Sequence, residues 1–251
     1  MAFIPFYDGE PLRHIRRAYV TYALIAANIL VFFIVQDGRW SASDYASAVS
    51  YGVIPATFSD LAVRPSDLDE IPDFLTLLTY GFLHGDLWHL FGNMIFLWVF
   101  ADNVEDSLGR VRFLIFYFLS LVGAGYAYVL AEPQSEAPVI GASGAVAGVI
   151  AAYLILHPFA KVWILALGRI PLHLSAFWVL GFWILFQLYQ VVFTEGGEIA
   201  WWTHIGGFLT GVVVVLLLKP ADVPLFARPE PAPEPLPELE AAEVDDLGTP
   251  R

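Results

Sequence analysis

Four polar side chains stand out in this chain because they interrupt runs that are otherwise apolar. His89 and Asn93 lie in the segment HGDLWHLFGN, Ser143 lies in GASGAVAG, and His204 lies in HIGGFLTG. A serine hydroxyl becomes a nucleophile when a base removes its proton, and histidine is the most common base. Attack on a carbonyl creates an oxyanion, which an asparagine amide, an imidazole N–H or a free backbone N–H can stabilise. These residue types therefore predict nucleophilic chemistry at Ser143, with His204 as the base.

This chemistry would take place in a membrane, because the chain is unusually apolar. Of its 251 residues, 58% are hydrophobic, and the mean hydropathy is +0.65. A helix that spans a bilayer needs about 20 mostly apolar residues, and six runs approach this length. The runs are 18–35, 87–101, 113–130, 139–156, 173–193 and 199–218. They do not alternate in polarity as barrel strands would. We therefore predict an all-α membrane protein with a bundle of six transmembrane helices.

Lysine and arginine are concentrated on one side of these runs, which predicts that this side faces the cytoplasm. The inner segments carry Arg13, Arg16, Arg17, Arg110, Arg112, Lys161, Arg169, Lys219 and the arginines of the tail. The outer segments carry Arg39 and Arg64. Both termini are then expected in the cytoplasm. Since no additional span or transit segment is evident, we expect a multi-pass protein of a bacterial plasma (inner) membrane.

Composition divides the chain into three parts. Residues 1–17 form a cytoplasmic N-terminal segment, residues 18–218 form the membrane domain, and residues 219–251 form an acidic, Pro-rich tail expected to be disordered. The long outer connection between the first two helices, 36–86, is rich in aromatic residues and leucine, and part of it should lie in the membrane interface. The net charge of −13 argues against nucleic acid as a partner. The chain has no cysteine, which excludes disulfides and thiolate sites.

In this topology the second, fourth and sixth helices all run from the outside to the inside. His89, Asn93, Ser143 and His204 each fall within the first two turns of their own helix, so all four lie near the outer face. His89 and Asn93, at positions i and i+4, share one helix face. Polar side chains in lipid are costly without partners, so each should point into the bundle. We therefore predict one site, with His89, Asn93 and the Ser143 N–H as oxyanion donors.

Glycines beside these residues predict that two helices approach closely. Gly144 and Gly148 form a pair of small residues next to the serine, while His204, Gly207 and Gly211 share one face of the sixth helix. Helices lined by small residues can pack with their backbones near each other, which would bring the serine within reach of His204. No acidic residue lies near His204 in the apolar runs, so we predict a Ser–His dyad rather than a triad with a carboxylate.

Together the three segments resemble the rhomboid family of intramembrane serine proteases. HGDLWHLFGN matches a His-x4-His-x3-Asn pattern, GASG the Gly-x-Ser-Gly nucleophile motif, and HIGGFLTG the base histidine followed by glycines. GASG alone is a weak signal, whereas the three motifs in this order on the second, fourth and sixth runs are highly specific. The resemblance covers residues 76–218, and the segment FADNVEDSLGRVRFLIFYFLSLVGAG is similar to bacterial members with six spans.

The resemblance implies a serine endopeptidase that cleaves membrane-anchored proteins near the outer face, with no cofactor and no metal. Its partners would be the transmembrane segments of substrate proteins and the lipid bilayer. Carried over residue by residue, Ser143 is the nucleophile and His204 is the base. The oxyanion and substrate-binding residues are His89, Asn93 and Gly141, and the structural residues near the site are His84, Gly144, Gly207 and Gly211.

Two positions depart from the family pattern. Many members carry a Trp-Arg pair in the outer connection, where this chain has Leu75 and Thr76. Some members stack a tyrosine on the base histidine from the position that Ala147 occupies here. The anchoring of the outer connection and the orientation of the base histidine are therefore open, with Trp201 or Trp202 as candidates for the second role.

Other interpretations of these residues remain open. A serine among small residues is more often a packing residue, and a scaffold without catalysis would bind membrane proteins through the same helices. A metal-dependent hydrolase or transporter would use His84, His89 and His204, although zinc sites usually add carboxylate or thiolate ligands. A channel or secondary transporter would place charged groups at the midplane, where these runs carry almost none.

The remaining polar residues in and beside the apolar runs receive structural interpretations. Gln187 and Gln190 lie in the fifth run and are expected to tie helices together. His14, His157 and His173 lie near the expected cytoplasmic helix ends and are expected to be solvated.

Overall fold

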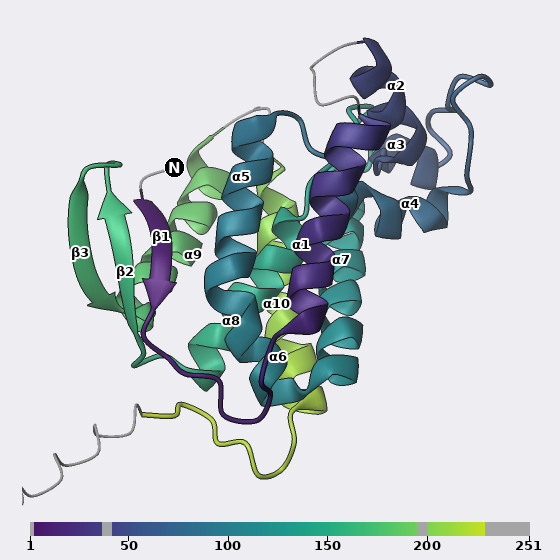
Figure 1. The fold of residues 1–251 in the computed structure, drawn as a ribbon. Helices are drawn as coiled ribbons and strands as arrows, with labels where there is room; N and C mark the ends of the chain where they lie inside the picture. Colours follow the sequence, from purple (N-terminus) through teal and green to yellow (C-terminus); the bar gives the residue numbers. More distant parts are fainter. Residues whose placement is uncertain (1–2, 37–41, 195–199, 229–251) are drawn as a thin grey trace, which may run out of the picture.

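The computed structural model describes residues 3–36, 42–194 and 200–228, and most of these residues are helical (Figure 1). The tail beyond residue 228, the arginine at position 39 and the start of the sixth apolar run lie outside these ranges. The fold is a helical bundle with a small sheet on one side and a cluster of short helices on the other (Figure 1).

Helices form over most of the length of the apolar runs. The segments of the bundle are α1 (Tyr19–Leu30) continued by η1 (Val31–Val35), α5 (Leu87–Phe96) continued by η3 (Leu97–Ala101) and α6 (Asp102–Leu108), α7 (Arg110–Ala131), α8 (Ser143–Leu156), α9 (Ala176–Phe193) and α10 (Trp201–Leu218). Within the described residues, α7, α9 and α10 are long and apolar enough to cross a membrane, while Tyr19–Val35 and Ser143–Leu156 are shorter apolar helices. The protein is therefore an integral membrane protein, and the count of six spans stays a prediction.

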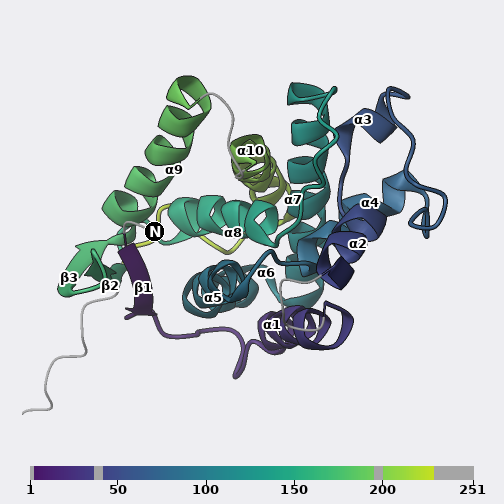
Figure 2. The same cartoon turned by 90° about the horizontal axis from the view of Figure 1, so that it is seen from above.

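Helix α8 occupies the middle of the bundle, with α5, α7, α9 and α10 around it (Figure 2). Every residue from Gly144 to Tyr153 is buried. The reason is the sequence SGAVAGVIAAYLIL, which is apolar on all faces and small at its start, so that neighbouring helices approach it from every side. A helix held in this way fixes the positions of the groups at its two ends.

The two ends of α8 lie in two different polar regions of the protein. The Ser143 end is the start of α8 together with the start of α5 and of α10. The Asp106 end lies beyond the last turn of α8, where α6, the residues before α1 and the start of α7 meet (Figure 1).

The outer connection folds into short helices beside α1 and α7. They are α2 (Ala42–Tyr51), α3 (Pro55–Phe58), α4 (Asp73–Thr79) and η2 (Tyr80–Phe82). Arg64 holds this cluster together, because its buried guanidinium donates to the carbonyl of Val49 at 3.0 Å and to that of Gly52 at 3.1 Å, and forms an ion pair with Asp73. One buried cation thus ties the end of α2 to the start of α4.

The fold is mostly helical, as predicted, but not all-α, because three strands form an antiparallel sheet in the order β1-β2-β3. They are β1 (Phe3–Asp8), β2 (Lys161–Ala166) and β3 (Ile170–Ser175). The fifth helix consequently begins at Ala176 and not at position 173. Strands β2 and β3 join through a tight turn in which Leu167 and Gly168 both have positive φ, as hairpin turns require. Periodicity could not separate these short apolar runs from helix.

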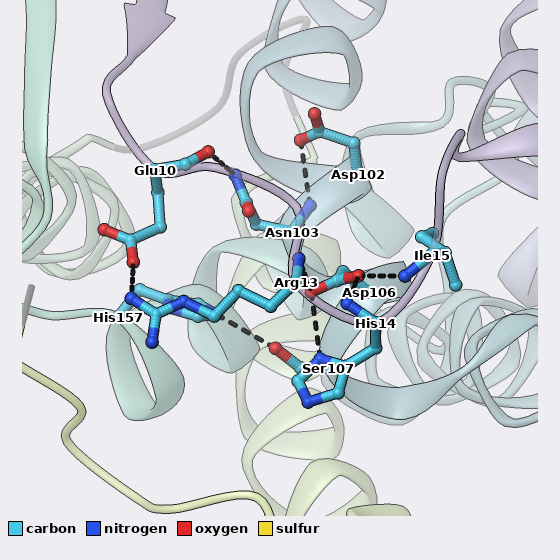
Figure 3. A network of polar contacts seen from close by, with 9 residues as sticks. All are labelled: Glu10, Arg13, His14, Ile15, Asp102, Asn103, Asp106, Ser107 and His157. Atoms are coloured by element: carbon cyan, nitrogen blue, oxygen red, sulfur yellow. Dashed lines mark hydrogen bonds and ion pairs between the residues drawn. The ribbon is translucent and has the colours of Figure 1, made fainter. Parts of the chain in front are cut away.

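Carboxylates on α6 organise the Asp106 end (Figure 3). Asp106 accepts hydrogen bonds from three consecutive backbone N–H groups, those of Arg13, His14 and Ile15, at 2.9, 2.7 and 2.7 Å. Burial acts to raise the pKa of Asp106, but these donors and the His14 ring together hold the pKa below its usual value. The carboxylate therefore fixes the backbone that leads into α1.

The histidines expected to be solvated differ from one another. His157 is half-buried, with its Nε2 3.0 Å from Ser107 Oγ, and burial lowers its pKa to about 4. His14 is exposed but has its Nδ1 3.0 Å from Asp106 Oδ2. His173 is exposed and stacks on Trp163 with a centroid separation of 4.5 Å. Only the His157 side chain departs from the expectation of solvent exposure.

Candidate active site

Helices α8 and α10 are in backbone contact through the glycines singled out in the sequence. A Cβ atom on Gly207 would lie 2.0 Å from the carbonyl oxygen of Gly144, and one on Gly211 would lie 2.5 Å from the Cα of Gly148. Real Cβ atoms never come this close, so glycine is required on the α10 side of both contacts. The close approach sets the distance between the side chains that begin these two helices.

Ser143 and His204 form a hydrogen bond across this contact, with Oγ and Nε2 2.9 Å apart. Both residues are half-buried, so neither is sealed inside the protein. The distance lies within the range expected for a nucleophile and its base before any substrate binds.

Gln187 on α9 makes the next contact of the base histidine. Its Oε1 lies 2.8 Å from His204 Nδ1, and its Nε2 donates to the carbonyl of Trp183 at 3.3 Å. Because the amide nitrogen faces a carbonyl, the amide oxygen faces the imidazole, and Nδ1 must carry the hydrogen. Nε2 is then the acceptor for the Ser143 hydroxyl. Sequence reasoning gave Gln187 only a helix-tying role and missed its contact with His204. The signal that could have found it is an amide side chain inside an apolar run.

Two tryptophans lie beside the His204 ring. The tyrosine that stacks on the base histidine in some rhomboid proteases is replaced here by Ala147. The ring centroids of Trp183 and Trp201 both lie 5.8 Å from that of His204. Trp202, the other candidate from the sequence, is exposed on α10. Ala147 is fully buried against neighbouring helices. The orientation of His204 thus depends on α9 as much as on its own helix.

His89 lies on the other side of Ser143, with Gly141 between them. The N–H of Gly85 donates to His89 Nδ1 at 3.3 Å, so the hydrogen of a neutral ring is on Nε2. A Cβ on Gly141 would lie 2.7 Å from His89 Nε2 and 3.7 Å from Ser143 Oγ. Gly141 also has φ of +125°, which side chains rarely allow. Glycine is therefore what permits the His89 ring to approach the serine.

Three further N–H donors belong to the predicted site, and one of them is already used in a hydrogen bond. The Gly141 N–H is bonded to the carbonyl of Tyr80 at 2.9 Å, so Gly141 contributes space and not a donor. Ser143 is the first residue of α8, and its N–H has no acceptor within the helix. Asn93 is buried, and its Nδ2 has no hydrogen-bond partner in the part of the chain that the structure describes.

His84 is buried beside His89, with ring centroids 5.1 Å apart, and neither of its ring nitrogens has a partner among the described residues. Its backbone is clamped by Gln36, whose Oε1 accepts from the His84 N–H at 2.8 Å and whose Nε2 donates to the His84 carbonyl at 2.9 Å. Sequence reasoning missed Gln36, which directly follows the first apolar run. Among the described residues, no group of three or more His, Cys, Asp or Glu side chains is arranged to hold a metal ion.

The outer connection is hydrogen-bonded directly to the segment before Ser143. Val53 and Val139 exchange two backbone hydrogen bonds, of 3.0 and 2.8 Å, and Thr79 Oγ1 donates to the carbonyl of Tyr51 at 2.6 Å. At the positions where many relatives have Trp-Arg, Thr76 is buried and its hydroxyl donates to the carbonyl of Asp73. The cation that anchors this connection is instead Arg64.

A family model and several known proteins each match more than half of this chain. A family model described as "Rhomboid domain" matches residues 71–221. "Rhomboid protein 1, mitochondrial" of Saccharomyces cerevisiae is 30% identical over 156 residues, which are 58% of this chain and 42% of that protein. "Rhomboid protease GluP" of Bacillus subtilis is 30% identical over 149 residues, 59% of this chain and 25% of that protein. "Rhomboid-like protease 3" of Toxoplasma gondii is 30% identical over 139 residues, 55% of this chain and 49% of that protein. The chain spans less than half the length of each of these relatives.

Proposed function

The chain belongs to the rhomboid family, and on this premise we propose that it is a serine endopeptidase that cleaves membrane-anchored proteins within the bilayer. The observation that supports the proposal most directly is the 2.9 Å hydrogen bond between Ser143 Oγ and His204 Nε2. A scaffold without catalysis would have no need for a base with its tautomer fixed toward a serine.

In the first step Ser143 Oγ attacks the scissile carbonyl while His204 Nε2 accepts the hydroxyl proton. Gln187 accepts a hydrogen bond from Nδ1 and stabilises the imidazolium as a dipole, without taking the proton. His204 then donates its proton to the leaving amine. A water molecule deprotonated by the same imidazole attacks the acyl-enzyme and releases the second product.

The oxyanion of each tetrahedral intermediate is stabilised by donors that are free in the resting protein. These are Asn93 Nδ2, the His89 Nε2–H and the backbone N–H of Ser143. Ser143 is at a helix N-terminus, where the helix dipole favours negative charge. Donors that need no rearrangement when charge develops are the most effective ones for this chemistry.

The position of the site suggests which substrates it takes. The partially exposed Ser143 and His204 lie at the ends of their helices, so a transmembrane segment must unwind to present an extended peptide bond to them. We place this end at the outer face, with both termini in the cytoplasm, six spans and a bacterial plasma membrane. The partners are thus membrane protein substrates and lipid, with no cofactor and no nucleic acid.

The test is cleavage of a single-pass substrate by purified wild type and Ser143→Ala, followed on gels. Ser175→Ala is the matched control, because the Ser175 side chain makes no capping bond at the start of α9. We expect cleavage by wild type and by Ser175→Ala only, and labelling of both by a fluorophosphonate probe. Cleavage that survives in Ser143→Ala would reject the serine mechanism, and the absence of labelling in wild type would favour a scaffold.

A further inference from the structure

A groove at the Asp106 end is unrelated to the chemistry at Ser143. It has a volume of about 460 Å³ and is lined by His14, Ile15, Arg16, Tyr19, Arg110 and Val111. The lining comes from two places only: the residues leading into α1 together with its first residue, Tyr19, and the first turn of α7. Three of the six lining residues are basic in type, and none is acidic.

The floor of the groove is rigid. Asp106 fixes residues 13–15 by accepting their three N–H groups (Figure 3). Glu105, the preceding residue on α6, accepts from the N–H and hydroxyl of Thr21, each at 2.8 Å, and so fixes the first turn of α1. These two carboxylates are buried, and their acceptor capacity is used by the backbone that carries the groove. They therefore shape the groove without presenting negative charge at its mouth.

The two arginines at the mouth of the groove have guanidinium nitrogens that are available to bind a ligand. Arg110 lies with its Cζ 5.0 Å from the centroid of the Tyr19 ring, and its Nε is 4.0 Å from Glu105 Oε1. Its terminal nitrogens have no hydrogen bond among the described residues. Arg16 is exposed and has neither a hydrogen bond nor an ion pair within the described ranges. Around the groove, residues 9–19 and 103–113 contain five arginines and three acidic residues.

Apolar surface continues from the groove along the bundle. Val111 is 72% exposed and Tyr19 is 55% exposed, and on the next turns Tyr22, Leu114 and Ile115 are exposed as well. On helices of a membrane protein this surface faces acyl chains. Arg16 and Arg110 lie at the end of this apolar surface, which corresponds to the level of the lipid headgroups. Cationic pockets between helices at this level select anionic lipids.

We propose that this groove binds the phosphate of an anionic phospholipid, with Arg16 and Arg110 pairing with the phosphate oxygens and the acyl chains lying along the exposed faces of α1 and α7. Guanidinium groups suit this role because their planar fork binds phosphate oxygens in pairs. The proposal rests on the membrane location of the protein and not on its catalytic activity or orientation. Free phosphate offers the same charge, but it does not use the apolar surface.

The test is native mass spectrometry of the full-length protein in neutral detergent, with phosphatidylglycerol or phosphatidylcholine of identical acyl chains. We expect wild type to bind phosphatidylglycerol in preference, and Arg16→Gln/Arg110→Gln to bind it about 30-fold more weakly, since each cation near an anionic headgroup contributes about fivefold. Lys161→Gln/Arg169→Gln removes the same charge from the β2–β3 hairpin and is the matched control, expected to bind within about threefold of wild type.

Arg16→Glu is a second variant, because Arg16 is exposed and makes no hydrogen bond or ion pair with a described residue, so its replacement does not threaten folding. It should also lose the preference. Equal losses in the groove variant and the hairpin control would overturn the proposal, as would equal binding of the two lipids by wild type. Displacement of the lipid by inorganic phosphate at equal concentration would assign the site to a soluble anion. Lipid binding that appears only after Glu238, Glu240 and Glu243 are replaced by Gln would assign the groove to the acidic tail.

Discussion

At the Ser143 end, polar side chains face one another across helices and several donors are left unused, whereas at the Asp106 end the carboxylates of Asp106 and Glu105 accept mostly from backbone N–H groups. Asn93 Nδ2 is buried without a described partner, while Asp106 accepts three N–H groups. An unsatisfied buried donor costs free energy in the resting protein. Its retention is explained if charge develops beside it during reaction. Saturated carboxylates instead hold chain segments in place.

The two ends also differ in what stabilises the segment packed against them. The outer connection is anchored through one buried arginine, Arg64, and through backbone bonds to Val139. The N-terminal strand is anchored through Asp8, which accepts from Tyr153 Oη at 2.6 Å and from Asn103 Nδ2 at 2.7 Å. The anchor of the outer connection, Arg64, is permanently charged, whereas the anchor of the N-terminal strand, Asp8, is a titratable acid. The stability contributed by Asp8 should therefore depend on pH, and that contributed by Arg64 should not.

The comparison fails most clearly if the Ser143 end is not catalytic. Ser143→Ala and His204→Ala should each lower kcat by about 10⁴-fold or more, because nucleophile and base act as one unit. For the same reason the double variant should lose little more than either single one. Steady-state cleavage of a transmembrane peptide measures this. A single variant that keeps a tenth of wild-type activity would remove the basis of the comparison.

If the free donor at Asn93 is kept for the transition state, Asn93→Ala should lower kcat by about 10²–10³-fold with little change in KM. Asn28→Ala provides the control, since Asn28 is also buried but lies on α1 and donates to its own helix. A change confined to KM, or an equal loss in the control, would instead indicate a substrate-binding or folding role.

Arg64 separates anchoring from catalysis. Arg64→Gln leaves the Asp73 carboxylate without its ion pair and two carbonyls without donors, which should cost about 3 kcal/mol. The outer connection should then become sensitive to proteolysis between α3 and α4, and the midpoint of thermal unfolding should fall. Arg169→Gln, at the exposed hairpin turn, should change neither quantity. An Arg64→Gln protein as resistant as wild type would contradict the anchoring role.

The Asp106 end should carry the pH dependence of stability. Burial raises the pKa of Asp8 to about 6 and that of Asp102 to about 7, with the charge of Asp8 adding to the second. A raised pKa means that stability is present below the ordinary value near 4 and is lost as pH rises through 6. For Asp8 this amounts to about 2 kcal/mol between pH 4 and pH 7. Asp8→Asn should reduce the fall in unfolding temperature across this range, leaving the contribution of Asp102, and an unchanged slope would show that Asp8 does not titrate with a raised pKa.

The smallest effect is expected at Gln187. Gln187→Leu removes the acceptor of the Nδ1 hydrogen, so that the imidazole loses its fixed tautomer and kcat should fall about tenfold, the worth of one hydrogen bond. Gln190→Leu changes an amide of the same helix one turn away and should leave kcat unchanged. Equal kcat in both variants would show that Gln187 does not contribute to catalysis beyond the Ser143–His204 dyad.

The sequence alone predicted the chemistry of the site and the helices that carry it. Ser143, His204, His89 and Asn93 could be grouped because each starts an apolar run, and the glycine faces indicated which two helices touch. These signals are local: residue type and helical spacing survive without knowledge of the fold.

Only the tertiary structure decided which distant groups complete these local patterns. Gln187 meets His204 because α9 packs beside α10, Arg64 reaches the carbonyls of Val49 and Gly52 across a loop, and β1 pairs with β2 although the partners Phe3 and Ala166 are 163 residues apart. Such contacts produce no periodic pattern in the sequence, because each joins one residue to a distant partner that only folding brings near. Apolar strands and helices also look alike until their pairing partners are known.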